Sequence, residues 1–165
     1  MTFVFVTTVI GLGFPSFGQA ETFTVGPGNG FASVTFPDSW NVRQVNRGLE
    51  ASTKDQEVYI WVEAYTEATL DKLRSEHEEY FTAQGVEVKG PPQIHTITKN
   101  GLEMKAMDVP AAWNGKRTVL RYVFFDPGLA SDWKLMLSSW ASPEGDKQYD
   151  AESTSILESV KFFGK

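Results

Sequence analysis

The chain contains no cysteine, and this absence excludes several kinds of chemistry at once. Without thiols there is no disulfide bond, no cysteine nucleophile, no thiolate ligand for zinc and no N-terminal cysteine to carry a lipid anchor. The fold must therefore depend on its hydrophobic core alone. A chain of 165 residues is long enough to bury one such core without metals or cross-links.

Positive charge is also scarce. The chain has 15 lysines and arginines against 21 aspartates and glutamates, a net charge of −6. Surfaces that bind nucleic acid or anionic membranes carry clusters of Lys and Arg, and the sequence contains no such cluster. We therefore expect neither nucleic acid nor an anionic membrane as a partner. The apolar fraction of 41% is typical of a globular protein and excludes a wholly disordered chain.

Residues 1–20 carry no charge at all. An apolar stretch over residues 3–14 is followed by the small-residue ending Gly18-Gln19-Ala20. The stretch is too short for a transmembrane helix, which needs ~20 residues, and signal peptidase accepts only small side chains at its cleavage site. We predict a secretory signal peptide over 1–20, cleaved after Ala20. This implies the periplasm of a Gram-negative bacterium, with no stable membrane insertion after cleavage.

The segment departs from the usual signal in one respect, because no Lys or Arg precedes Phe3. Two alternatives stay open. One is a buried N-terminal strand, and the other is a membrane anchor if Met1 is retained on the exported protein. Identification of Glu21 as the mature N-terminus would decide among the three.

The remaining chain is predicted to form one domain. Residues 21–30 end in a Gly-Pro-Gly-Asn-Gly run, which predicts a flexible N-terminal segment. The run is not a phosphate loop, since it lacks the strand before it, the helix after it and the Lys-Ser/Thr pair. Residues 31–165 contain no linker or internal repeat and are expected to be a single α+β domain.

Alternating apolar residues and turn signals predict the first group of strands. These strands are expected over residues 31–36, 40–45, 49–52 and 57–64. In the last one, Val58 and Ile60 alternate with Tyr59 and Trp61, so both faces are apolar and both need to be covered.

Two segments have the composition of helices. Residues 67–84 are rich in helix formers and repeat apolar residues at spacings of three and four, with Thr66 or Thr69 as the cap and Gly85 as the stop. A second helix is expected near residues 147–161.

Two Asn-Gly pairs, at 100–101 and 114–115, each separate alternating runs. This is the strongest short-range sign of a two-residue hairpin, because both central residues need positive φ. With a further strand predicted over 132–141, the hairpins give a four-stranded meander. The order of strands, helix, meander and closing helix predicts an α+β fold, an antiparallel sheet of about six strands flanked by helices.

The hairpin registers bring three polar residues together. Asp108 is expected opposite Arg121, and His95, opposite Ala106, lies diagonally from Asp108 on the same face. Such a group could bind an anionic or polar ligand through the guanidinium. The alternative is a structural ion pair with His95 incidental. We favour this alternative, because Pro110 is placed to distort the register.

No catalytic residue, metal site or cofactor is predicted. His77 has acidic neighbours, but there is no HExxH pattern and adjacent helical positions point apart, so we expect it on the inner stripe of its helix. The acidic residues between 144 and 152 lack the ligand alternation of an EF-hand. There is also no Gly-x-Ser-x-Gly elbow to present a nucleophilic serine.

The segment 36–40, FPDSW, resembles the start of PsbP-like proteins, the superfamily of the extrinsic photosystem II subunit and its bacterial relatives. The Gly48 turn, the strand over 58–62, the Asn-Gly hairpins and the ending over 156–162 follow the same order. The resemblance covers about residues 31–163. It implies an α/β/α sandwich with an antiparallel sheet and mostly non-enzymatic, partner-binding roles. It carries over no catalytic motif.

Two tryptophans expected on strands, Trp61 and Trp113, complete the candidate binding residues, since aromatics outside the core often anchor partners. The first hypothesis is a non-catalytic periplasmic accessory protein that binds another protein through a sheet face or edge. The second is a carrier or sensor of a small apolar or amphipathic ligand. A hydrolase with unassigned carboxylates comes third. An enclosed apolar pocket of about 300 Å³ or more would favour the carrier, whereas a flat aromatic patch would favour partner binding.

Overall fold

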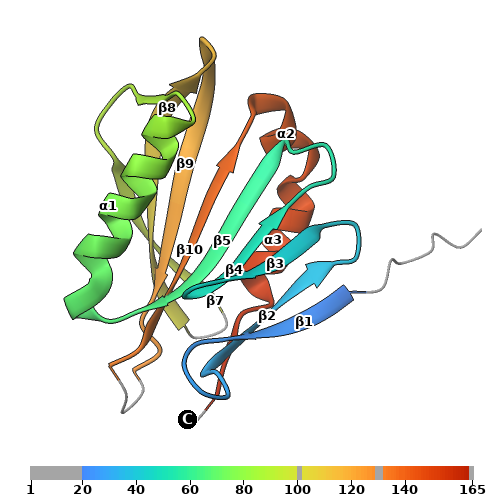
Figure 1. The fold of residues 1–165 in the computed structure, drawn as a ribbon, viewed down its shortest axis with the longest axis vertical. Coiled ribbons are helices and arrows are strands. Elements are labelled where there is room, and N and C mark those ends of the chain that lie inside the picture. Colours follow the sequence, from blue (N-terminus) through green and yellow to red (C-terminus); the bar gives the residue numbers. More distant parts are fainter. Residues whose placement is uncertain (1–19, 100–101, 129–131, 164–165) are drawn as a thin grey trace, which may run out of the picture.

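The computed structural model describes residues 20–99, 102–128 and 132–163 (Figure 1). The predicted signal peptide, apart from Ala20, lies outside these residues. Within the described ranges, no helix has the length and apolar character that crossing a bilayer would require.

The described residues form eleven strands and three helices. In chain order these are β1 (Ala20–Val25), β2 (Ala32–Pro37), β3 (Asn41–Val45), β4 (Gly48–Ser52), β5 (Val58–Tyr65), α1 (Glu67–Ala83), β6 (Val86–Val88), β7 (Gln93–Lys99), β8 (Leu102–Trp113), β9 (Lys116–Phe125), β10 (Lys134–Ala141), α2 (Pro143–Gln148), α3 (Asp150–Glu158) and β11 (Lys161–Phe162).

The strands make two antiparallel sheets. Eight strands form the large sheet in the order β3-β4-β5-β10-β9-β8, with β6 and β7 both paired to the outer side of β8. A three-stranded sheet has the order β1-β2-β11. The α+β antiparallel architecture is as predicted, but six strands was too few. Strands as short as β6 and β11 contain too few residues for their alternation to be read from the sequence.

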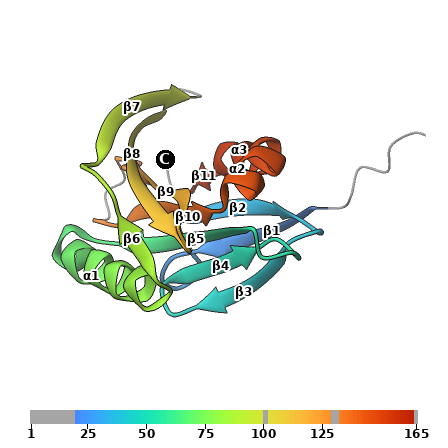
Figure 2. The ribbon, with the colours of Figure 1, turned by 90° about the horizontal axis from the view of Figure 1, so that it is seen from above.

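The helices cover both faces of the large sheet. Figure 2 shows α1 on one face and α2 and α3 on the other. The two-sided apolar strand β5 lies in the middle, with Val58 and Ile60 in one core and Trp61 in the other, where Tyr59 packs against it. The prediction that both faces of this strand are covered is therefore correct.

Two hydrophobic cores result. The first lies between the large sheet, the three-stranded sheet and α3, and includes Phe36, Ile60, Val123, Phe125, Leu135, Leu137 and Ile156. The second lies under α1 and includes Trp61, Tyr65, Leu73, Phe81, Leu120, Tyr122, Met136 and Trp140.

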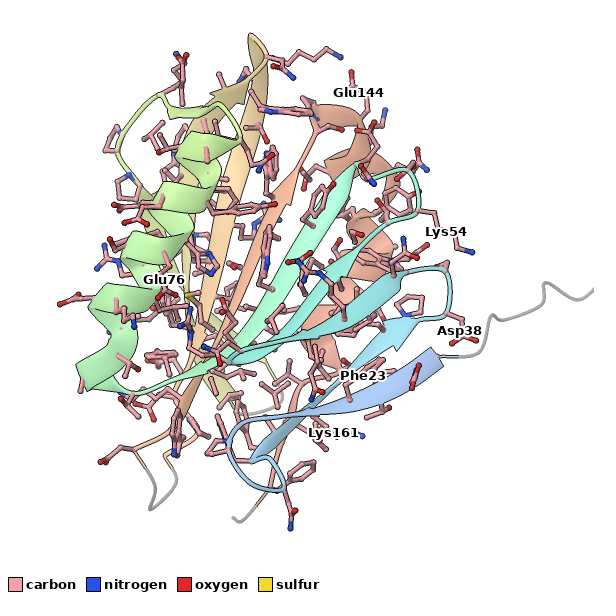
Figure 3. All side chains as sticks on the ribbon, in the orientation of Figure 1. Phe23, Asp38, Lys54, Glu76, Glu144 and Lys161 are labelled. Atoms are coloured by element: carbon pink, nitrogen blue, oxygen red, sulfur yellow. The ribbon has the colours of Figure 1, made fainter. Side chains whose placement is uncertain are left out.

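The segment expected to be flexible, residues 21–30, is instead mostly ordered. Its first half belongs to β1, which pairs antiparallel with β2, and Phe23 (labelled in Figure 3) and Val25 pack in the first core. The glycine run closes a turn in which the Phe31 amide donates to the Val25 carbonyl at 3.0 Å. The strand was missed because the glycine run that follows it dominated the sequence pattern.

The helix predicted over 67–84 is α1. Thr66 and Thr69 form a capping box, in which the Thr66 amide donates to Thr69 Oγ1 at 2.9 Å. Leu73, His77 and Phe81 make up its buried stripe. His77 is therefore on the inner face, as expected.

The second helix, expected near residues 147–161, is divided into α2 and α3 at Tyr149. Helix α2 starts earlier than predicted because the Ser142 hydroxyl caps it, accepting from the Gly145 amide at 2.9 Å. Gly145 packs closely on Glu57, the residue before β5, since a Cβ atom there would lie 2.6 Å from the Glu57 carbonyl oxygen.

The predicted hairpin registers are correct. Asn114 and Gly115 have φ of 50° and 76°, as a two-residue turn requires, and the strands β8 and β9 pair without a slip. The first Asn-Gly turn lies outside the described residues, but β7 and β8 pair as expected on either side of it. Pro110 does not distort the register. Its carbonyl accepts from the Lys89 amide between β6 and β7, so its missing N–H falls in the gap between those two strands.

Candidate functional site: a groove beside helix α1

The predicted polar cluster forms only in part. Arg121 Nε lies 2.8 Å from Asp108 Oδ1, and Asp146 on α2 is 3.9 Å from the same guanidinium. His95 lies opposite Ala106, as predicted, but it is exposed and makes no hydrogen bond or ion pair with any described residue. The structure therefore places an ion pair here with His95 apart from it. A ligand-binding role for these three residues stays a prediction.

The two candidate tryptophans lie at the second core. Trp61 is 7% exposed, and its indole N–H donates to Glu50 Oε2 at 3.1 Å. Trp113 is half-buried, donates to the Gln84 carbonyl at 2.9 Å and packs edge-on against Trp140. Both indoles thus support the region around α1. Their role as binding anchors also stays a prediction.

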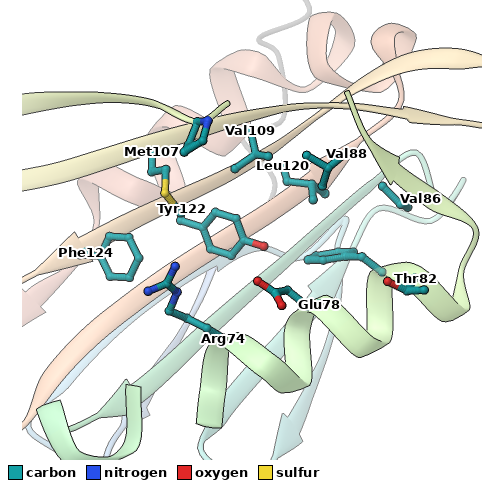
Figure 4. Close-up of a pocket in the computed structure, with 12 residues that line it drawn as sticks. Arg74, Glu78, Thr82, Val86, Val88, Met107, Val109, Leu120, Tyr122 and Phe124 are labelled. Atoms are coloured by element: carbon teal, nitrogen blue, oxygen red, sulfur yellow. The ribbon is translucent and has the colours of Figure 1, made fainter. Parts of the chain in front are cut away.

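The described residues form a groove between α1 and strands β6, β8 and β9, which we call the α1 groove. Its volume is about 440 Å³, within the range of roughly 300–1,000 Å³ typical of small-ligand sites. Its lining, drawn in Figure 4, consists of Arg74, Glu78, Phe81, Thr82, Val86, Val88, Pro92, Met107, Val109, Leu120, Tyr122 and Phe124.

The groove exists because α1 covers only the inner part of its sheet face. The helix packs over β5 and β10 through His77 against Trp61 and through Phe81 against Trp140. The outer strands β8 and β9 present Val109 and Leu120 on the same face, but the helix does not fill the space above them. Strands β7 and β8 also curve away from the sheet in Figure 2. An apolar floor is left beside the helix.

Polar groups gather at one part of the groove. In Figure 4, Arg74 and Glu78 both extend from α1 toward Tyr122, the Glu78 carboxylate on the side of its hydroxyl and the Arg74 guanidinium toward its ring and Phe124, whereas Val86 and Val88 lie toward the other end. Burial, together with the smaller effect of the Glu78 carboxylate, raises the pKa of Tyr122 to about 12, and the Arg74 guanidinium opposes the rise. The phenol is therefore a protonated hydrogen-bond donor at neutral pH.

A second polar group is buried beneath α1. His77 Nε2 lies 2.6 Å from Glu63 Oε2, and Ser138 Oγ lies 3.4 Å from His77 Nδ1. Arg47 approaches Glu63 at 3.4 Å and also pairs with Glu76, whose pKa it lowers.

The contacts from Ser138 to His77 and from His77 to Glu63 follow the pattern of a hydrolytic Ser-His-acid triad. Ser138, however, is 0% exposed, and none of the three residues lines the α1 groove. We interpret these residues as a structural polar contact that holds α1 on the sheet. The sequence carried a signal for it, since Glu63 is the one charged residue of β5 and His77 is the polar member of the inner stripe of α1. Across the described ranges, no three His, Asp or Glu side chains are grouped so as to hold a metal ion.

Comparison with known proteins finds similar structures but no similar sequence family. No family model and no curated protein matches the sequence. The chain is similar in structure to CyanoP, the PsbP protein of Synechocystis, with a TM-score of 0.60 and 8% identity over 96% of this chain and 99% of that one. It is also similar to LpqN of Mycobacterium tuberculosis, involved in cell envelope biogenesis, with a TM-score of 0.57 and 12% identity over 87% and 91% of the two chains.

A more distant likeness is to the Ran-binding protein Mog1p of Saccharomyces cerevisiae, with a TM-score of 0.50 and 10% identity over 88% of this chain and 96% of that one. The class that the fold defines is therefore the PsbP-like α+β sandwich. The resemblance to PsbP-like proteins that was seen in residues 36–40 and in the order of the elements is therefore confirmed at the level of the fold.

Proposed function

We propose that the chain is a non-catalytic accessory protein of the bacterial periplasm that acts by binding, and that the α1 groove is its binding site. The groove supports the proposal, because its volume is about 440 Å³ and its lining combines a mostly apolar surface with a few polar groups, Arg74, Glu78 and Tyr122. The buried Ser138 supports the non-catalytic part, since a substrate has no path to its hydroxyl in this structure.

Within this proposal, the occupant is a small amphipathic ligand, which makes the protein a carrier or sensor. The groove is open rather than the enclosed pocket expected of a carrier, and the support it gives is its volume, which exceeds the roughly 300 Å³ at the lower end of small-ligand sites. Trp61 and Trp140 are buried in the core, so among the described residues these two tryptophans do not form an exposed aromatic patch beside the groove.

Export rests on residues 1–20. Cleavage after Ala20 would leave Glu21 as the first residue and would keep nearly all of β1, which pairs with β2. LpqN, a structural neighbour, is involved in cell envelope biogenesis, which supports a place outside the cytoplasm. Mass spectrometry of protein recovered from a periplasmic fraction tests this step. A mature chain that begins at Glu21 is expected, and a chain that retains Met1 would contradict it.

A protein partner is the second candidate, favoured by one observation at the edge of the large sheet. Val88 on β6 and Ile94 on β7 are 62% and 69% exposed, and both strands pair with β8 on one side only among the described strands. Apolar side chains on an edge strand suit strand addition by a partner. The structural neighbour Mog1p is a Ran-binding protein, which supports a partner-binding role on this fold.

Filling the groove tests the proposal directly. Val109→Trp places an indole in the α1 groove, whereas Val119→Trp places one on β9 facing away from it. We expect the wild type and V119W to enhance the fluorescence of the neutral probe N-phenylnaphthylamine, and V109W to lose most of that enhancement. Equal enhancement by V109W and V119W would show that the probe binds elsewhere and would refute the groove as the site.

A further inference from the structure

The charged lining residues of the α1 groove, Arg74 and Glu78, both lie near Tyr122, and this placement identifies a ligand class. We infer that the groove takes a single-chain amphiphile with a carboxylate head, the head on Arg74 and Tyr122 and the tail over Leu120 toward Val86. The inference rests on the proposed binding function of the groove, and it adds the charge and the orientation of the ligand.

The head site consists of two unused donors. Among the residues that the structure describes, neither the Arg74 guanidinium nor the Tyr122 hydroxyl has a hydrogen-bond or ion-pair partner. Tyr122 is 8% exposed, so its hydroxyl is held in place by a buried ring. A carboxylate has two oxygens that only accept, and hydrogen bonds to an ionised group are stronger than neutral ones.

Glu78 is the one acidic side chain in the groove lining, and it opposes an anionic head. Glu78 follows Arg74 by four positions on α1. Helical ion pairs are stronger when the acidic residue comes first, so this order favours pairing less. The two side chains form no ion pair within 4 Å. The Arg74 guanidinium therefore has no direct ion-pair partner among the described residues. A cationic head would meet Glu78 but would also face Arg74 and the donor O–H of Tyr122.

The rest of the lining suits a hydrocarbon chain. Beyond Tyr122 the walls are formed by Leu120, Val109, Val86 and Val88, with Thr82 at the margin (Figure 4). None of these residues is charged, so this part of the groove has no partner for a charged group at the far end of the ligand. A tail buried here gains about 0.8 kcal/mol per methylene group removed from water.

Three probes with the same ten-carbon tail and different heads separate the ligand class from the groove itself. Isothermal titration calorimetry at neutral pH compares decanoate, decanol and decyltrimethylammonium, each below its micelle-forming concentration. We expect decanoate to bind about tenfold more tightly than decanol, and decyltrimethylammonium to bind more weakly than decanol.

Substitutions of Arg74 and Glu78 should then change the affinity for decanoate in opposite directions. Arg74→Gln is expected to weaken decanoate about five- to tenfold, and Glu78→Gln to strengthen it about twofold, each leaving decanol unchanged. The matched control is Lys72→Gln on the same helix, because Lys72 faces Glu76 rather than the groove. Lys72→Gln should leave all three affinities within about twofold of the wild type.

The other possible results refute the carboxylate head, the assigned polarity or the small-ligand function. Equal binding of the three probes, abolished by V109W, would refute the carboxylate head and leave the proposed groove intact. Tightest binding of decyltrimethylammonium, lost in Glu78→Gln, would reverse the assigned polarity. Absence of binding by all three probes would refute the small-ligand function together with this inference.

Discussion

His77 on α1 lies 2.6 Å from Glu63 on β5, measured between imidazole Nε2 and carboxylate Oε2, and the two side chains are only 9% and 6% exposed. Arg47 lies 3.4 Å from the other oxygen of Glu63 and also pairs with Glu76 on α1. Helix α1, which forms one wall of the α1 groove, is thus tied to the sheet by a buried polar contact as well as by its apolar stripe.

Removal of His77 should weaken the fold strongly. His77→Ala leaves the buried Glu63 with Arg47 as its remaining partner, and loss of one member of a buried pair costs about 3 kcal/mol of unfolding free energy. The chain has 2 histidines, and the exposed His95 is the matched control. His95→Ala should change stability by no more than about 0.5 kcal/mol in urea unfolding. Equal losses in the two variants would contradict a tie at His77.

Gly48, next to Arg47, allows close approach between β4 and β5. A Cβ atom at this position would lie 1.9 Å from the Val62 carbonyl oxygen, so backbone must move to admit it. We expect Gly48→Ala to lose about 2 kcal/mol of unfolding free energy or more. At Gly90 the nearest atom to an added Cβ is 3.9 Å away, so Gly90→Ala should be close to neutral in the same urea titration. A stable G48A variant would disprove this packing.

The ion pair between Asp108 and Arg121 should contribute to stability and not to binding in the α1 groove. Their side chains are 28% and 41% exposed, so Asp108→Ala should cost only about 0.5–1 kcal/mol. They point to the face of the sheet that carries α2, opposite the α1 groove, and decanol affinity should therefore be unchanged. A melting curve identical to that of the wild type would show that the pair does not stabilise the fold.

Tyr122 should make the fold sensitive to alkali. Its pKa is raised from 10.0 to about 12, chiefly by burial, so between these values the unfolded chain loses the phenol proton while the folded chain retains it. The stabilisation from this group is complete below about pH 10 and is lost as pH rises toward about 12. Tyr65, with a pKa raised to about 12 by burial, acts in the same direction.

The corresponding measurement is urea unfolding over that pH range. Tyr122→Phe should lose less unfolding free energy than the wild type between about pH 10 and about pH 12, because one of the buried phenols is gone. An identical loss in the wild type and the variant would indicate that Tyr122 ionises as freely in the folded chain as in the unfolded one.

Much of the fold follows from local patterns in the sequence. The Asn114-Gly115 turn fixes the register of β8 and β9, including the pairing of Asp108 with Arg121, because only one register is compatible with a two-residue loop. The bounds of α1 follow from its capping threonine Thr66 and from its apolar spacing. These features depend on residues close to one another in the chain.

The features that were missed depend on tertiary placement. Strand β11, Lys161–Phe162, has two residues and exists because β2 lies beside it. The contact of His77 with Glu63 needs α1 to lie over β5, which no local pattern specifies. The α1 groove arises from the part of the sheet that α1 leaves uncovered, so Val109 and Leu120 could be assigned to a face from the sequence but not to a cavity.

The most direct test of the α1 groove as the binding site is heteronuclear NMR of the uniformly labelled mature chain titrated with decanol. We expect chemical-shift changes concentrated at Val86, Val109, Leu120 and Tyr122, with the strand β3 on the far edge of the sheet unaffected. The same titration of Val109→Trp should give no such changes. Shifts that cluster on another surface, or that persist in V109W, would contradict the account.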